Sequence, residues 1–137
     1  MTKCFLIIHD GPGRWIRADK STDEVWPNPH SAPPGAMYFA EWYHYRSRQE
    51  GEPIVYGFDW DNQFTPPLMV VTPGVIWDID SRASNCTRKN DKTHRCWCRH
   101  GEAPNITVDK FGDTCSAGAG SIQCGNYHGF LQNGFLT

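Results

Sequence analysis

The final segment of the chain, HGFLQNGFLT, is the feature that most constrains the fold. Asn133-Gly134 lies between two short apolar pairs. This dipeptide suits a two-residue hairpin turn, because both residues tolerate the positive φ angles that the turn requires. A second hairpin is predicted in PLMVVTPGVIWDI, where Pro73 presets the first central turn position and Gly74 supplies a positive φ at the second. Both segments therefore predict antiparallel strands.

Composition favours a small protein rich in strands. The chain has 137 residues, which suits one domain spanning 1–137. Its six Trp, seven Phe and five Tyr, together with 13 Gly and 10 Pro, favour short strands and turns around an aromatic core over a helical bundle. The apolar runs CFLII, EPIVYGF and NITVD are further strand candidates.

One segment favours a helix instead. AMYFAEWYHYRSRQEG, residues 36–51, follows two prolines that suit a helix start, and Gly51 suits its end. Met37, Phe39 and the tyrosines also alternate as in a strand, so both interpretations stay open, with the helix preferred. We therefore predict an α+β fold, mainly antiparallel β, built as a small single-domain sheet or open barrel with about one short helix.

Charge and targeting signals limit the partners of the protein. The net charge of −2 and the pI near 6.3 give no overall basic field, so binding to nucleic acid is not expected. The first residues, MTKCFLIIHDGPG, lack the long apolar core of a signal peptide, and no apolar run approaches the roughly 18 residues of a membrane helix. We therefore expect no membrane association, and cysteines that stay reduced or bind metal, although their even number leaves disulfides open.

The stretch HRCWCRHG places His94, Cys96, Cys98 and His100 at every second position. On a regular strand, neighbours on one face lie about 6.6 Å apart. Ligands of a single zinc ion must lie within roughly 4 Å of one another. The stretch therefore supplies at most one or two ligands, and the same spacing disfavours a disulfide between Cys96 and Cys98.

Other ligands must then come from elsewhere in the chain. A sheet of three strands could bring Cys86, Cys96 and Cys115 together, with His128 as the fourth ligand of a structural zinc site. The chain has no C-x-x-C pair, which zinc ribbons and fingers usually show. Buried free thiols that behave as small apolar side chains are the alternative.

The other face of the same stretch carries Arg95, Trp97 and Arg99. Two guanidinium groups beside an indole form a platform for a planar or anionic ligand. His100 follows as a group that can titrate or transfer protons. The alternative is a solvated face on which the arginine stems cover Trp97.

TCSAGAGS, residues 114–121, contains Gly118 and Gly120 among small neighbours. Backbone amides in such a loop can approach and bind an anion. Cys115 could also act as a nucleophile if His100 or His128 activates it. The alternative is a crowded turn that accepts only small residues.

Two pairs of aspartates are also candidates for chemistry. Asp59 with Asp61, and Asp78 with Asp80, each alternate along a predicted strand. Paired carboxylates can bind Mg²⁺ or act as acid and base. The alternative is that they face solvent beside a buried residue such as Ile79, with an Asp paired to Arg82.

Four motifs resemble those of a group of small proteins of unknown function encoded by tailed bacteriophages. They are WDIDSRASNCT, HRCW-x-RHG, ITVDK-x-G-x-TC-x-AGAGSI and YHGFL-x-NG, and PPGAMYF near Pro33 is similar as well. The resemblance covers roughly residues 75–137. It implies a phage origin and the cytoplasm of an infected bacterium, but no activity. Its motifs include Cys86, Cys96 and Cys115 but not Cys98 or Cys124, which favours the first three as the metal or structural set.

Three functions remain open after these observations. The preferred one is a non-enzymatic phage accessory protein, a compact zinc-stabilised β-rich module that binds a host or phage protein or a small anionic ligand. The second is a hydrolase that depends on Cys115 or on a metal held by aspartates. The third is a minor component of the virion. We prefer the first because the candidate catalytic groups show no recognisable mutual spacing.

Overall fold

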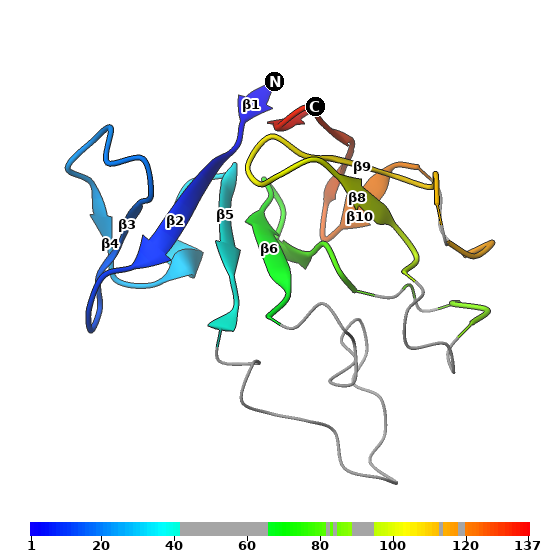
Figure 1. Cartoon of the computed structure of the whole chain (residues 1–137), viewed down its shortest axis with the longest axis horizontal. Helices are drawn as coiled ribbons and strands as arrows, with labels where there is room; N and C mark the ends of the chain where they lie inside the picture. Colours follow the sequence, from blue (N-terminus) through cyan, green and yellow to red (C-terminus); the bar gives the residue numbers. More distant parts are fainter. Residues whose placement is uncertain (42–65, 82, 84, 89–94, 113, 118–119) are drawn as a thin grey trace, which may run out of the picture.

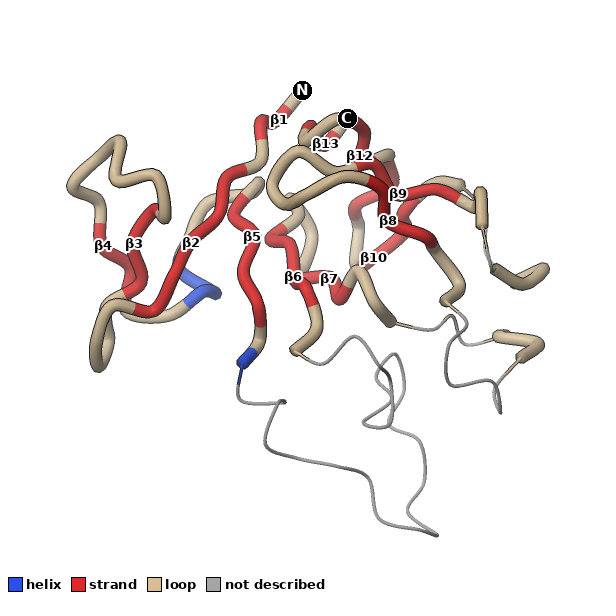
Figure 2. Tube along the Cα trace, viewed as in Figure 1, coloured by secondary structure: helices blue, strands red, loops and turns tan. Residues whose placement is uncertain are grey.

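Three β-sheets make up the described part of the chain in this computed structural model (Figures 1 and 2). The described residues are 1–41, 66–81, 83, 85–88, 95–112, 114–117 and 120–137.

The largest sheet has six strands in the order β4-β3-β2-β5-β6-β7. Its β2 and β5 are parallel, and its other neighbours are antiparallel. The strands are β2 (Phe5–His9), β3 (Trp15–Arg17), β4 (Val25–Trp26), β5 (Ala36–Phe39), β6 (Leu68–Val71) and β7 (Ile76–Asp78). A 3-10 turn, η1 (Pro29–Ser31), lies between β4 and β5 and begins where the Asn28 side chain accepts a hydrogen bond from the Ser31 backbone.

A second sheet has five antiparallel strands in the order β1-β13-β12-β9-β8. It joins the two ends of the chain, because β1 pairs with β13 (Figure 1). The strands are β1 (Thr2–Lys3), β8 (Cys98–His100), β9 (Thr107–Asp109), β12 (Leu131–Gln132) and β13 (Phe135–Leu136). A separate antiparallel hairpin consists of β10 (Ile122–Cys124) and β11 (Tyr127–Gly129).

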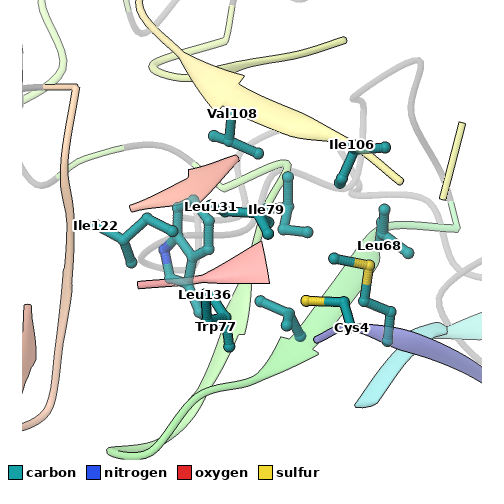
Figure 3. Packing of buried hydrophobic residues seen from close by; sticks show 11 residues of the cluster. Cys4, Leu68, Trp77, Ile79, Ile106, Val108, Ile122, Leu131 and Leu136 are labelled. Carbon is teal, nitrogen blue, oxygen red and sulfur yellow. The ribbon is translucent and has the colours of Figure 1, made fainter. Parts of the chain in front are cut away.

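The central strands β5 and β6 of the larger sheet are largely buried on both faces. Residues of β5 and β6 alternate between two apolar clusters, which explains why both strands read as continuous apolar runs. One cluster lies between the two large sheets, where Figure 3 shows Trp77 and Ile79 grouped with Leu131 and Leu136. The other cluster packs the opposite face against the segment that contains β4 and η1; its buried members are Ile7, Trp26, Ala32, Ala36, Tyr38, Ala40 and Val71.

Both predicted hairpins are confirmed, but one turn differs from the prediction. Asn133 and Gly134 have φ angles of 50° and 78°, as the two-residue turn requires. Gly74 does not adopt a positive φ; instead, the Thr72 hydroxyl accepts hydrogen bonds from the backbone nitrogens of Gly74 and Val75 at 3.2 and 3.0 Å. Glycine is needed there because an added Cβ would lie 2.8 Å from the Cys124 carbonyl oxygen.

The predicted helix is wrong where the structure describes it, since Ala36–Phe39 form β5. Pairing with β2 and β6, and burial of both strand faces, outweigh the proline and glycine signals that favoured a helix. Residues 42–51 and the predicted strand EPIVYGF lie outside the described residues. The remainder of the prediction, a small and mainly antiparallel β fold, is confirmed, and its sheets do not close into a barrel. No helix in the described ranges has the length and apolar character needed to cross a bilayer.

A buried carboxylate links the two large sheets. Asp80 follows β7, and its Oδ1 lies 2.8 Å from Arg95 Nη1 and 3.5 Å from Arg99 Nε on the β8 side. Its Oδ2 accepts a hydrogen bond of 2.9 Å from the Leu68 backbone at the start of β6. The Asp80 and Arg95 side chains are only 2% and 6% exposed. This ion pair is therefore shielded from solvent, unlike a surface pair.

Replacing Asp80 with Asn is expected to destabilise the protein by about 3 kcal/mol, because the buried Arg95 guanidinium group then loses its charged partner. Urea unfolding followed by fluorescence measures this change. Asp10→Asn is the matched control, since Asp10 pairs with Arg14 at 3.7 Å with both side chains about half exposed, and it should cost less than about 1 kcal/mol. Equal losses in the two variants would show that the buried pair has no special role.

Candidate metal centre

Three cysteine sulfurs meet in the described structure. The Sγ atoms of Cys86, Cys96 and Cys115 lie within 4.8 Å of one another, and those of Cys96 and Cys115 are 3.8 Å apart. A tetrahedral metal with metal–sulfur bonds of about 2.3 Å separates its ligands by about 3.8 Å. The prediction that these cysteines converge is therefore confirmed, and their spacing suits a metal ion.

Three separate segments supply the sulfurs. Cys86 closes a turn with Ala83, Cys96 lies just before β8, and Cys115 lies in the loop between β9 and β10. Two cationic side chains connect these segments. Arg88 Nη1 donates to the Thr114 carbonyl at 3.1 Å, and Lys110 Nζ donates to the carbonyls of Cys96 and Ala117.

Backbone amides point at two of the sulfurs. The Ala83 nitrogen donates to Cys96 Sγ at 3.2 Å, and the Ala117 nitrogen donates to Cys115 Sγ at 3.4 Å. Hydrogen bonds to the charged form of an ionisable group favour that form. Since metals bind thiolates rather than thiols, these two amides favour the form of the sulfur that a metal requires.

The same contacts give two of the thiols opposite pKa shifts. Burial raises the pKa of Cys96 to about 12. Desolvation also acts to raise the pKa of Cys115, but hydrogen bonds from the backbones of Thr87 and Ala117, the Thr87 side chain and Cys96 outweigh it and lower the pKa to about 6. At neutral pH Cys115 is thus a thiolate and Cys96 a thiol. Metal binding would displace the Cys96 proton.

His128 does not join the three sulfurs, so its assignment as the fourth ligand is wrong. It lies on β11 opposite Gln123, is exposed, and hydrogen-bonds with Ser121 Oγ at 3.0 Å. The β10–β11 hairpin forms a sheet of its own, which the predicted three-strand arrangement did not foresee. His94, the first residue of HRCWCRHG, lies outside the described residues.

The predicted platform of Arg95, Trp97 and Arg99 is not an open surface. Arg95 is buried against Asp80. Trp97 packs edge-to-face on Trp77, with ring centroids 5.6 Å apart, and Lys110 Nζ lies 5.5 Å from its ring centre. Both arginines contact Asp80, so they lie on the same side of the stretch. Arg95 and Trp97, however, pack against other residues and do not form an open surface.

Arg99 lines a surface cavity of about 320 Å³. The cavity also contains Glu102 and apolar atoms of Phe39, Leu68 and Ile106. Arg99 keeps 22% of its side chain exposed, so its guanidinium group is partly accessible. The next residue, His100, which was also predicted to bind the ligand, is exposed, and its Nε2 lies 2.9 Å from Asp109 Oδ1.

The predicted glycine-rich anion loop is described only in part. Gly118 lies outside the described residues. Gly120 is described, and a Cβ added to it would meet no atom within 4 Å. The crowding that would require glycine is therefore not found at Gly120.

Only one of the two predicted pairs of aspartates, Asp78 with Asp80, is described. Asp59 and Asp61 lie outside the described residues, as does Arg82. Asp80 is buried with two arginines rather than facing solvent, and its backbone nitrogen donates to Asp78 Oδ1 at 2.9 Å. Burial, followed by the charge of Asp80, raises the pKa of Asp78 to about 8. Asp78 is thus largely protonated at neutral pH.

Sequence reasoning missed the groups that support the sulfurs. The amides of Ala83 and Ala117 donate hydrogen bonds to sulfurs. The side chains of Arg88 and Lys110 donate to backbone carbonyls of the segments that carry the sulfurs. Of these groups, only the side chains of Arg88 and Lys110 can be recognised from the sequence as hydrogen-bond donors. Nothing in their spacing shows which carbonyls they reach. The partners of Asp80 were missed for a related reason, because Arg82 is nearer in sequence than Arg95 and Arg99.

No known protein-family model matches the chain, and neither does any curated protein or solved structure.

Asp78→Asn is expected to reduce the pH dependence of stability. A folded-state pKa of about 8, above the ordinary value of 3.8, means that the folded protein holds an extra proton between these two pH values. The contribution of Asp78 to the free energy of unfolding is therefore fully present below about pH 4 and is lost as the pH rises to 8. The free energy of unfolding, measured with urea, should fall between pH 5 and 8 by about 1 to 3 kcal/mol more in the unsubstituted chain than in Asp78→Asn. Identical slopes at the same zinc concentration would refute this account.

Proposed function

We propose that this protein is a non-enzymatic accessory protein of a tailed bacteriophage, acting in the cytoplasm of the infected cell. A zinc ion on Cys86, Cys96 and Cys115 stabilises its β-rich fold, and the cavity at Arg99 contacts a small anionic ligand or a host or phage protein. The observation that carries the proposal is the convergence of three sulfurs from distant segments. The phage origin rests on the sequence resemblance alone.

Zinc is proposed because of the chemistry of the ligands. Thiolate ligands are typical of structural zinc sites, which hold four ligands and contribute directly to folding. The cluster provides three sulfurs, so the proposal requires one further donor. The burial of Cys86 and Cys96, 6% and 0% exposed, suits a structural role better than an open catalytic site.

The ligand is proposed to bind in the Arg99 cavity, because the predicted platform of Arg95, Trp97 and Arg99 is not an open surface. A guanidinium group recognises carboxylates through a planar pair of donors. The Phe39 side chain, 38% exposed and part of the same lining, would contact the body of the ligand. A small aromatic carboxylate has both features, whereas Glu102 in the same cavity disfavours a multiply charged anion.

A cysteine-dependent hydrolase is the second candidate, favoured by the lowered pKa of Cys115. The described partners of its sulfur are Cys96, Thr87 and Ala117, and neither His100 nor His128 is among them. A general base must lie within hydrogen-bond reach of its nucleophile. The structural role of Cys115 is therefore preferred. Detection of the protein in purified virions would instead support the third candidate, a minor virion component.

Elemental analysis of the protein purified without added metal is expected to find about one zinc per chain. Cys96→Ser and Cys86→Ser should each lower this content at least about fivefold, and zinc removal should lower the melting temperature, because metal binding is coupled to folding. Cys124→Ser is the matched control, since Cys124 is half-buried and contacts Thr72 outside the cluster at 3.4 Å. Zinc far below one equivalent in a folded protein would refute the zinc proposal.

Benzoate is the probe for the Arg99 cavity. Ligand-observed NMR should detect benzoate binding and much weaker binding of benzamide, which lacks the charge. Arg99→Gln should weaken benzoate binding about tenfold, consistent with loss of a charge-assisted hydrogen bond of about 1.5 kcal/mol. Arg14→Gln, at an exposed arginine far from the cavity lining, is the control. Equal binding of benzoate to both variants, with melting curves confirming that each is folded, would contradict the proposed site.

A further inference from the structure

The cysteine cluster contains a pair of thiols placed for oxidation. We propose that Cys96 and Cys115 form a reversible disulfide when hydrogen peroxide oxidises the protein, and that this bond competes with zinc for the same sulfurs. The zinc part rests on the function proposed above, whereas disulfide formation does not. None of the six cysteines, all of which lie among the described residues, is part of a disulfide in the structure.

The distance between the sulfurs supports this pairing. Cys96 and Cys115 Sγ atoms are 3.8 Å apart, and a disulfide bond is about 2.05 Å long. The sulfurs must therefore approach by about 1.8 Å. Cys96 is fully buried, at 0% exposure. Cys115 lies in a loop segment between strands, so the smaller rearrangement is a movement of Cys115 toward Cys96.

Exposure decides which sulfur the oxidant reaches first. Cys115 is the half-buried member of the cluster, whereas Cys86 and Cys96 are buried. The Ala117 nitrogen donates a hydrogen bond of 3.4 Å to Cys115 Sγ. Redox-sensitive cysteines typically combine accessibility with a neighbouring thiol that resolves the first oxidation product. Cys115 is thus the attacked sulfur and Cys96 the resolving one.

The reaction proceeds in two balanced steps. The Cys115 thiolate attacks one peroxide oxygen, the O–O bond breaks, an S–O bond forms, and the departing hydroxide takes a proton from solvent to leave as water. The Cys96 thiol then attacks the sulfur of the resulting sulfenic acid, an S–S bond forms, and the thiol proton leaves with the hydroxyl group as a second water. Overall, two thiols lose two electrons and peroxide accepts them.

Disulfide formation removes two of the three thiolate donors of the cluster. A zinc ion held there would keep only Cys86 of the three, and would be released. Bound zinc in turn occupies the sulfur electron pairs that attack peroxide, so zinc should slow the oxidation. The cluster therefore has two exclusive states, one with metal and one with a disulfide.

The test uses the full chain with Cys98→Ser and Cys124→Ser, so that the tryptic peptides 96–99 and 111–137 each keep one cysteine. The protein is treated with hydrogen peroxide, alkylated, digested without reductant and examined by mass spectrometry. A linked 96–99/111–137 peptide is expected, with two thiols lost per chain and both recovered by dithiothreitol. A chromogenic chelator should report about one zinc released per disulfide.

Two further variants separate the parts of the proposal. Cys86→Ser should keep the linked peptide while losing zinc, and Cys115→Ser should lose the linked peptide. A link from peptide 83–88 instead, or direct conversion of Cys115 to sulfinic acid without any link, would overturn the disulfide. A linked peptide from protein that never held zinc would refute the zinc site alone. Equal rates of oxidation with and without a full equivalent of bound zinc would refute the competition.

Discussion

The ion pair of Asp80 with Arg95 and Arg99 is the interaction on which the arrangement of this protein depends. One carboxylate contacts the start of β6 through the Leu68 amide, follows directly from β7, and binds the two arginines that flank Cys96 and Cys98. Burial raises the pKa of Asp80, while Arg99 and Arg95 counteract that shift. Burial also lowers the pKa of Arg95 to about 10, which still leaves it charged at neutral pH. The stability of the contact between the sheets therefore depends on both partners staying in place.

This ion pair also determines where the cysteine cluster forms. Arg95 is adjacent to Cys96, so fixing the arginine against Asp80 fixes the backbone that carries the buried sulfur. On the other side, Lys110 holds the Cys96 carbonyl and also the Ala117 carbonyl beside Cys115. The Trp97 ring contacts both the Trp77 ring and the Lys110 ammonium group. Cys96 and its neighbours Arg95 and Trp97 thus connect the sulfur cluster to the ion pair and the apolar core.

The sequence allowed the strands and the convergence of Cys86, Cys96 and Cys115 to be predicted, but not the details that depend on distant contacts. Asn133-Gly134 determines its turn geometry locally. Strand spacing alone limited HRCWCRHG to one or two ligands, and of its described residues only Cys96 belongs to the cluster of three sulfurs. The predicted helix was wrong because pairing with the neighbouring strands β2 and β6 makes Ala36–Phe39 a strand. His128 failed because sequence gives no information on which sheet receives β11. Arg95 was read as a surface residue because alternation shows which residues share a face, but not whether that face is covered.

A shortage of apolar side chains explains why this part of the chain would use metal and charge. Within the described residues from 83 to 117, the buried apolar side chains are Cys86, Cys96, Ile106, Val108 and Ala117. Only two of them are large aliphatic groups, each contributing about 1.5 to 3 kcal/mol on burial. The loops that carry Cys86 and Cys115 gain almost nothing from this source, so ordering them requires other contacts to offset their conformational entropy. The cations Arg88 and Lys110 supply some of these contacts, and a metal on three thiolates would supply the rest. Loss of the metal would then loosen these loops first, while the six-stranded sheet and its two apolar clusters keep their own packing.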